Sequence, residues 1–274
     1  MSEQVVVEIF VIGNEILAGD ILDTNTNWLC KEIGNLGGYV ARTATLRDDA
    51  GTIATEIRAA LGRGTDVIFT SGGLGPTVDD LTLAGVAQGV GVKIQLHEQA
   101  LKMIGERYDE MAAQGKIAHG GLNPSREKMA WLPEGAVPLS NPVGTACWVL
   151  LRAGKTSIIS LPGIPPELKG IFTSSLQPFL RGTFGAGLSA VQNIIARCND
   201  ETLMEPLLRR IIGNHPKVYI KSLVKTCGAP EIKFTLKAAG NDRSELDSLI
   251  DAASKELRDG LESVGVPYFD AQKQ

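Results

Sequence analysis

The stretch of residues 65–80, TDVIFTSGGLGPTVDD, constrains the possible folds of this chain more than any other segment. Its apolar, β-branched start at 67–69 predicts a buried strand, and three glycines follow it. Thr77 and Asp80 then have the T-x-x-D spacing of a helix capping box. In such a strand–turn–helix unit, glycines allow backbone N–H groups to converge on an anion, and the helix N-terminus adds to the attraction. The stretch therefore predicts an α/β fold with a phosphate-binding turn.

Two acids within this stretch suggest a metal ion as well. Asp79 and Asp80 would lie beside a bound phosphate, and that arrangement is repulsive unless a cation lies between them. A structural interpretation is equally open at this point, because glycine-rich turns are common in α/β proteins and Asp in a first helical turn is favoured by capping alone. The stretch matches neither G-x-G-x-x-G nor a P-loop, so neither of these nucleotide-binding motifs is present here.

Two similar units precede this stretch. The nearly continuous apolar runs at 5–12 and 39–46 predict strands buried on both faces, and a helix pattern follows each of them. Three strand–loop–helix units in succession predict a doubly wound, mostly parallel sheet with right-handed crossovers. Asp23 or Thr24 is best explained as the cap of the first helix, and Asp49 as the cap of the second. The acids at the strand ends should gather along one edge of the sheet, and they are Glu15, Asp48, Asp79 and Asp80.

In the second half of the chain, the order of predicted strands and helices changes. Strands are expected at 147–151 and 156–161, followed by a helix at 167–181, and then by the linker-like segment GTFGAGLSA. Beyond it, the pattern of residues 191–274 predicts a small βαββα unit of the α+β class, without an acid cluster or glycine turn. We therefore expect two domains, at 1–181 and 191–274.

The composition of the chain limits which ligands it can bind and in which cellular compartment it is expected. A net charge of −4 and a pI near 5.5 argue against a nucleic-acid partner, and no apolar run is long enough to span a membrane. With no signal-peptide pattern at the N-terminus, a cytosolic protein is expected. Cys30, Cys147, Cys198 and Cys227 are widely spaced, which predicts reduced thiols and no zinc site. With only three histidines, any metal should be held by oxygen, which favours Mg²⁺ or Mn²⁺.

Four segments in order resemble a known family. VIGNEILAGDILDTNTNWL, TSGGLGPTVDDLT, NPVGTA and LPGIPPELKGIF are similar to motifs of the competence/damage-inducible protein A (CinA) family, which has a molybdopterin-binding-type fold. The βαββα unit resembles the small second domain of that family. The motifs GNEIL and DTNT are also similar to motifs in the N-terminal domain of eukaryotic FAD synthases.

The resemblance implies a function and a set of site residues. It implies metal-dependent hydrolysis of ADP-ribose, or of a related pyrophosphate such as FAD, to AMP and a phosphorylated product, with Glu15, Asp79 and Asp80 as catalytic residues. The alternatives are a non-catalytic module that binds molybdopterin or a nucleotide, and adenylyl transfer to molybdopterin. A homodimer is also implied. The remaining ligand-binding residues implied by the family motifs are Asp23, Asn25, Gly72, Gly73, Gly75, Thr77, Asn141, Gly144, Thr145, Pro162 and Gly163.

The chain also departs from the family pattern in two ways. Asn14 stands where many bacterial members have Thr, which suggests a substrate preference nearer to that of the FAD synthase branch. Many bacterial members continue into a domain that deamidates nicotinamide mononucleotide, and this chain ends at Gln274. We therefore expect the deamidase activity to be absent.

Overall fold

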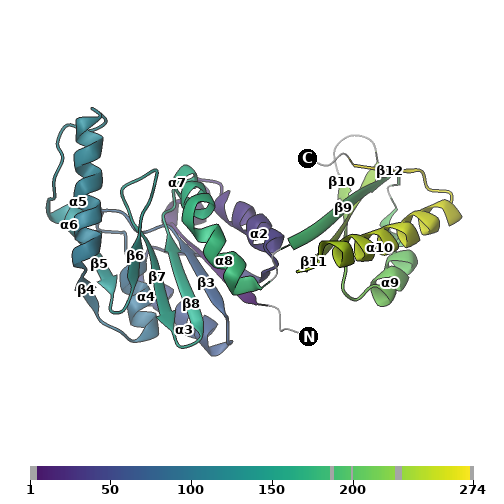
Figure 1. Ribbon diagram of the computed structural model, residues 1–274, viewed down its shortest axis with the longest axis horizontal. Helices are drawn as coiled ribbons and strands as arrows, with labels where there is room; N and C mark the ends of the chain where they lie inside the picture. The colour runs from purple at the N-terminus through teal and green to yellow at the C-terminus, as the bar shows by residue number, and fades with distance from the viewer. Residues whose placement is uncertain (1–4, 186–187, 199, 226–229, 272–274) are drawn as a thin grey trace. The chain divides into compact units, whose positions relative to one another are not determined.

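The computed structural model describes residues 5–185, 188–198, 200–225 and 230–271. The chain divides into two compact units between Thr183 and Phe184, and each is described by itself (Figure 1). We call the N-terminal part unit 1 and the C-terminal part unit 2. Cys30, Cys147 and Cys198 are free thiols, and Cys227 lies outside the described residues.

Unit 1 is built on a six-stranded sheet with the strand order β2-β1-β3-β8-β7-β6. β1, β2, β3 and β8 are parallel, whereas β7 is antiparallel to β8 and β6 is antiparallel to β7. The strands are β1 (Val6–Ile12), β2 (Tyr39–Leu46), β3 (Val67–Ser71), β6 (Val137–Leu139), β7 (Trp148–Ala153) and β8 (Thr156–Leu161). The mostly parallel sheet predicted from the alternating pattern is confirmed.

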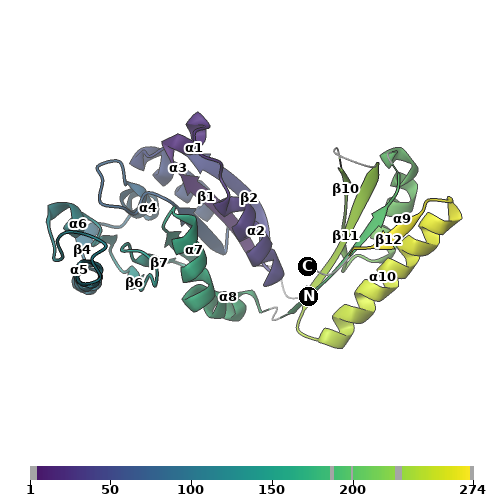
Figure 2. The ribbon, with the colours of Figure 1, turned by 90° about the horizontal axis from the view of Figure 1, so that it is seen from above.

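Helices cover both faces of this sheet, which explains why its central strands are nearly all apolar (Figures 1 and 2). On one face, α3 (Ala50–Gly62) and α4 (Thr82–Val90) pack on the core through residues such as Ile57 and Val86. On the other lie α2 (Asn25–Asn35), α7 (Pro165–Ile171) and α8 (Gln177–Phe184). A π-helical turn, Phe172–Leu176, joins the last two, and its Phe172 ring meets the edge of Trp28 at a centroid distance of 5.0 Å.

One charged residue, Glu8 in the middle of β1, interrupts this apolar core. Its side chain is only 2% exposed, and its carboxylate accepts hydrogen bonds from Arg63 (2.8 and 2.6 Å) and Thr65 (2.6 Å). Burial alone would raise the pKa of Glu8, but the bonds from Arg63 and Thr65 outweigh it and lower the pKa. A buried carboxylate is therefore stable here because it is fully paired.

A helical segment lies beyond the main sheet of unit 1. It contains α5 (Glu98–Ala113) and the short α6 (Pro124–Lys128), and the two-stranded sheet of β4 (Ile94–Leu96) and β5 (Trp131–Pro133) closes it off. The helix α5 agrees with the sequence pattern. The strands β4, β5 and β6 were not foreseen from the sequence, because three residues are too few to show a period.

Unit 2 is a four-stranded antiparallel sheet with the order β10-β11-β9-β12. Its strands are β9 (Leu188–Ala196), β10 (Tyr219–Lys225), β11 (Glu231–Gly240) and β12 (Tyr268–Asp270), and its helices are α9 (Glu205–Asn214) and α10 (Arg243–Ser263). Alternate residues of β11, from Ile232 to Ala238, are buried in the core that these helices share with the sheet. The pattern is thus βαββαβ, with one edge strand, β12, more than the predicted βαββα. Within the described ranges, no strand of unit 2 joins the sheet of unit 1.

Candidate functional site

A cavity of about 480 Å³ opens at the carboxyl ends of β1, β3 and β8. This is where parallel α/β sheets place their ligands, because the loops that leave neighbouring strands diverge there. The cavity is large enough for a nucleotide-sized ligand. Of the residues predicted from the sequence, its walls contain Glu15, Asp23, Asn25, Asp48, Gly72, Gly73, Gly75, Asp79, Asp80, Thr145, Pro162 and Gly163.

The other three predicted residues lie beside this cavity. Asn141 and Gly144 line a second cavity of about 190 Å³, together with Thr145. Thr77 is connected to the cavity wall by hydrogen bonds from its hydroxyl to the side chains of Asp79 and Asp80. The residues that the sequence motifs single out therefore come together around one sheet edge.

Glycines allow the loops of β1, β3 and β8 to approach each other closely. Gly72 has φ +107°, and a Cβ atom there would lie 2.2 Å from the carbonyl oxygen of Ile12. A Cβ atom at Gly163 would lie 3.2 Å from the Cα of Gly72. Side chains at these positions would separate the strand ends, so the glycine turn is a packing requirement as well as a potential phosphate cradle.

Asn25 fastens the same strand ends from the side of α2. Its amide nitrogen donates to the carbonyl oxygen of Gly163 at 2.7 Å and to Ser71 Oγ at 3.2 Å. The residue is 6% exposed, and its Oδ1 has no hydrogen-bond partner among the residues in the described ranges. Asp23 caps the start of α2 by accepting from the N–H of Thr26 at 2.9 Å, as the sequence predicts.

The turn after the glycines differs from the predicted capping box. Asp80 does accept from the N–H of Thr77 at 2.9 Å and from its hydroxyl at 2.6 Å, but α4 begins only at Thr82, after Leu81. The hydroxyl of Thr77 also donates to Asp79, and this bond lowers the pKa of Asp79. Thr77 thus closes a separate turn that holds both aspartates, and the prediction of a helix start at Thr77 is wrong.

Lys128 supports this turn from α6. Its ammonium group donates to the carbonyl oxygen of Asp80 at 2.8 Å and to that of Thr77. Its positive charge also contributes to the lowered pKa of Asp79. This contact could not be predicted from the sequence, because the partners are about fifty residues apart in the chain.

The four acids expected at the sheet edge act on one another electrostatically, and we call them the acid cluster: Glu15, Asp48, Asp79 and Asp80. Burial raises the pKa of Asp48, the negative charges of the other three raise it further, and a hydrogen bond from the N–H of Asn14 (2.7 Å) opposes both effects. Glu15 lies in the short helix α1 (Asn14–Ala18), which the sequence pattern did not reveal. The predicted convergence of these acids is supported by the effect of the other three on Asp48 and by their common place on the cavity wall.

The acid cluster does not form a complete metal cage. Within the described part of the chain, no three acidic, histidine or cysteine side chains are grouped closely enough to hold a metal ion. Mg²⁺ is commonly bound through one or two carboxylates together with substrate phosphates, and it keeps several water ligands. The residues therefore fit a metal ion that arrives with a phosphorylated ligand, and not a permanently bound one.

Glu167, which the sequence analysis missed as a site residue, also lines the cavity. Its Oε2 accepts a hydrogen bond of 2.7 Å from the amide of Asn141, and burial raises its pKa. In the sequence, Glu167 follows Pro165 and Pro166, where an acid is common in a first helical turn and needs no further role. Its position beyond a strand end was the signal that could have identified it.

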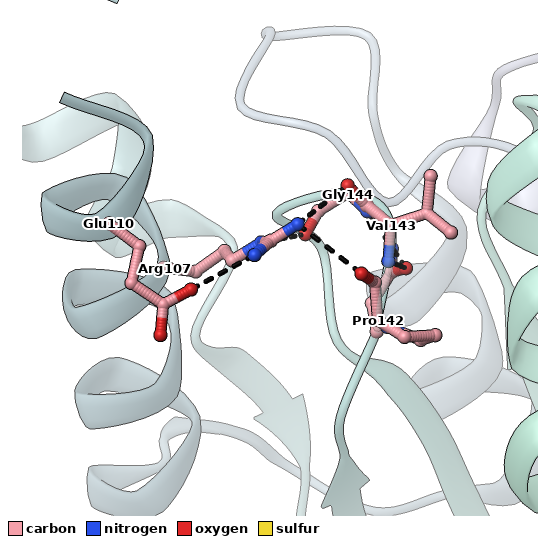
Figure 3. A network of polar contacts seen from close by, with 6 residues as sticks. Arg107, Glu110, Pro142, Val143 and Gly144 are labelled. Atoms are coloured by element: carbon pink, nitrogen blue, oxygen red, sulfur yellow. Dashed lines mark hydrogen bonds and ion pairs between the residues drawn. The ribbon is translucent and has the colours of Figure 1, made fainter. Parts of the chain in front are cut away.

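Arg107 on α5 holds the loop that carries Asn141 (Figure 3). Its guanidinium donates to the carbonyl oxygens of Pro142 (3.4 Å), Val143 (2.8 Å) and Gly144 (3.0 Å), and it pairs with Glu110 at 2.9 Å. Arg suits this role because its planar fork reaches several acceptors at once. The sequence pattern alone places Arg107 on a solvated helix face.

Comparison with known proteins places unit 1 in a family. Residues 8–182 match the model described as "Probable molybdopterin binding domain". A protein of Pyrobaculum arsenaticum is 34% identical over 257 residues, covering 93% of this chain and 94% of its own length, and one of Aeropyrum pernix is 35% identical over 259 residues, covering 94% of both chains.

A solved structure shares the fold. The crystal structure of the protein CinA, of unknown function, from Thermoplasma acidophilum is 33% identical and superposes with a TM-score of 0.58, covering 65% of this chain and 99% of its own. No helix in the described ranges has the length and apolar character needed to cross a membrane. The chain belongs to the probable molybdopterin-binding domain family and is CinA-like in both sequence and fold.

Proposed function

We propose that the cavity of unit 1 is the active site of a metal-dependent nucleotide pyrophosphatase, which hydrolyses ADP-ribose or a related pyrophosphate such as FAD. The observation that carries this proposal is the arrangement of one glycine turn and four carboxylates, three of which act on Asp48, around a cavity of about 480 Å³. Repulsion of this kind favours a divalent cation, and the glycine turn favours phosphate oxygens. Each feature alone has a structural explanation, but together they match a pyrophosphate–metal complex.

In this proposal each part of the cavity has a separate task. The backbone of Gly72–Gly75 steadies the phosphate oxygens, and Thr77 and Lys128 hold the turn that presents Asp79 and Asp80. Glu15 and Asp48 complete the acidic wall. When bound, a divalent cation such as Mg²⁺ or Mn²⁺ supplies charge neutralisation and a more acidic water ligand. Attack of water on one phosphorus then releases AMP and, from ADP-ribose, ribose 5-phosphate.

The experiment that tests this function pairs turnover with stability. The parent protein is incubated with ADP-ribose, FAD or NAD and either Mg²⁺ or Mn²⁺, and release of AMP is followed by chromatography. Asp79→Asn and Asp80→Asn should reduce turnover about a hundredfold or more, because Asn is a much weaker ligand for a hard cation. Their thermal midpoints should change little, since Asn replaces Asp well in turns. The exposed Asp251 of α10 provides a matched control, Asp251→Asn, which should hydrolyse like the parent.

A non-catalytic module that binds molybdopterin is the second candidate, and the family match favours it. In that case the acid cluster would organise the turn and water, and no divalent ion would promote release of AMP from any of the three substrates. Adenylyl transfer to molybdopterin would use the same cavity with a different nucleophile. With molybdopterin and ATP added to the assay, it would appear as AMP attached to the pterin phosphate, with release of pyrophosphate, in place of free AMP.

Two further expectations concern the state of the protein. We propose a homodimer, which light scattering tests directly, since a monomer has a mass of 29.2 kDa. We also propose a cytosolic location, in keeping with a nucleotide or pterin ligand and reduced cysteines.

A further inference from the structure

Glu167 lies on the cavity wall apart from the acid cluster. The charges that act on Asp48 are those of Glu15, Asp79 and Asp80, and Glu167 is not among them. Glu167 is affected first by burial, then by the hydrogen bond from Asn141, and then by the positive charge of Arg107. Glu167 thus lines the same cavity as the acid cluster, beside the loop that carries Asn141.

The loop 141–144 is built around the Glu167 carboxylate. Asn141 donates to Glu167 through Nδ2 and accepts through Oδ1 from the N–H groups of Val143 (3.0 Å) and Gly144 (2.9 Å). A Cβ atom at Gly144 would lie 2.0 Å from Glu167 Oε2, so the carboxylate packs directly on that glycine. Arg107 then fixes the outer side of the loop through its three carbonyl groups (Figure 3). The position of Glu167 is thus held by three residues from two segments.

The carboxylate nevertheless lacks most of its hydrogen-bond partners. A carboxylate can accept about four hydrogen bonds, and within the described part of the chain only Asn141 donates to Glu167. Arg107 does not form an ion pair with it, because its guanidinium is directed to carbonyl oxygens and to Glu110. The residue is only partly buried and lines the cavity, so donors of a ligand can reach the acceptor positions that Asn141 leaves open.

We propose that Glu167 forms a subsite that binds two adjacent hydrogen-bond donors of the ligand. The vicinal diol of a ribose presents such a pair, and the aminopyrimidinone edge of a pterin presents another. This inference rests on the proposed function in one respect, namely that the cavity takes a phosphorylated ligand whose phosphates lie at the acid cluster. It adds that the sugar or the pterin ring is recognised at Glu167, beside Asn141.

A purely structural role gives a different expectation. Glu167 lies in the first turn of α7, where a carboxylate interacts favourably with the helix N-terminus and needs no ligand. If that were its whole role, replacing it would disturb the loop 141–144 and weaken every ligand of the cavity to a similar degree. Recognition of donors predicts instead a loss confined to ligands that carry the donor pair.

The test uses matched ligands that differ in a single donor group, measured by titration calorimetry on the full chain. The pairs are ribose 5-phosphate with 2-deoxyribose 5-phosphate, AMP with 2′-deoxy-AMP, and pterin with lumazine, in which a carbonyl replaces the amino group. Inorganic pyrophosphate with Mg²⁺ serves as the ligand without donors. The parent should prefer the donor-bearing member of one pair by about tenfold, the effect of one hydrogen bond to a charged group. The pair that discriminates identifies a ribose or a pterin as the ligand group.

Glu167→Gln should reduce that preference to about twofold or less, because an amide offers one acceptor in place of a carboxylate. Affinity for pyrophosphate should stay within about twofold of the parent. Gly144→Ala should have the same effect as Glu167→Gln, since its methyl group displaces the carboxylate, whereas Glu98→Gln at the exposed start of α5 should change nothing.

Three outcomes would overturn the subsite. They are a parent that does not discriminate within any pair, a Glu167→Gln variant that keeps the preference, and an equal loss of pyrophosphate binding. None of these measurements depends on turnover. A parent that discriminates but hydrolyses neither ADP-ribose nor FAD would disprove the proposed hydrolysis and leave the subsite intact.

Discussion

The carboxylates of unit 2 and those around the cavity of unit 1 are held in opposite ways. On α9 and α10 they face cations, as in Glu205 with Arg209 (2.6 Å), Lys255 with Asp259 (2.7 Å) and Lys217 with Glu245 (2.9 Å). Around the cavity, no ion pair to Glu167 or to any member of the acid cluster is present among the residues with described side chains.

The pKa shifts follow the same division. In unit 2, burial opposes ionisation of Glu256, but hydrogen bonds from His215 and Asn214 outweigh it and lower the pKa. In unit 1, burial raises the pKa values of Asp48 and Glu167 without sufficient compensation. Paired carboxylates favour folding, whereas unpaired ones oppose it. Asp48 and Glu167 therefore oppose folding where Glu256 favours it, as expected if they serve a ligand under the proposed function.

The largest effect should come from the paired acid within unit 1. Arg63→Met leaves the buried Glu8 carboxylate with Thr65 as its remaining partner, so unit 1 should lose about 3 kcal/mol of stability. Adding Glu8→Gln should restore part of that loss by removing the charge. Urea unfolding followed by tryptophan fluorescence reports on unit 1, because Trp28, Trp131 and Trp148 all lie there. A change below about 0.5 kcal/mol would mean that pairing does not stabilise buried carboxylates in this protein.

The pairing of Glu8 with Arg63 also makes the stability of unit 1 depend on pH, and the direction of this effect follows from the lowered pKa of Glu8. Because the folded state lowers the pKa of Glu8 below its ordinary value of 4.5, the contribution of Glu8 to stability is present above pH 4.5 and is lost as the pH falls through the lowered pKa. The parent should therefore lose stability in that range more steeply than the double variant.

The unpaired acids should show the reverse effect, of intermediate size. Glu167→Gln and Asp48→Asn each remove a carboxylate whose pKa the fold raises, so each should raise the thermal midpoint of unit 1 at pH 7 to 8. The folded state holds these protons more tightly than the unfolded state, so ionisation costs stability as the pH rises through the raised pKa. The gain should disappear below about pH 4, where both states are protonated. Scanning calorimetry at four or five pH values checks this, and a lower midpoint at pH 7 would contradict it.

The smallest effect is expected on the surface of unit 2. Arg209 and Glu205 form an exposed pair one helical turn apart, with Arg209 81% exposed, and Arg209→Met should cost at most about 0.5 kcal/mol. Far-UV circular dichroism in urea is the suitable measurement, since unit 2 contains no tryptophan. A loss comparable to that of Arg63→Met would show that the exposed pairs are as important as the buried one, and the comparison would fail.

Sequence patterns predicted the elements whose signals are local and long. The apolar runs of β1, β2, β3 and β8 and the periodic pattern of α5 needed no knowledge of their neighbours. The short strands β4, β5, β6 and β12 have three residues each, and the partners of β4, β5 and β12 are remote in the chain. Such strands carry too few residues to show a period.

The site was predictable to a similar extent. The glycines and acids at strand ends were identified because parallel strands bring their ends together whatever the side-chain packing. Glu167, Arg107 and Lys128 were missed because each acquires its role from partners 26 or more residues away. The start of α4 was misplaced because the hydrogen bonds of Thr77 to Asp79 and Asp80 form an isolated turn with the spacing of a cap.

The strand order has a consequence for how the protein is made. β3 ends at Ser71, but its partner β8 begins only at Thr156, so the edge of β3 has no strand to pair with until the ribosome has synthesised the whole segment between them. Parallel pairing over such a separation is slow, and an unpaired apolar edge invites association with other chains. Nascent chains halted between these two strands should therefore bind chaperones strongly, and chains released after residue 161 should not.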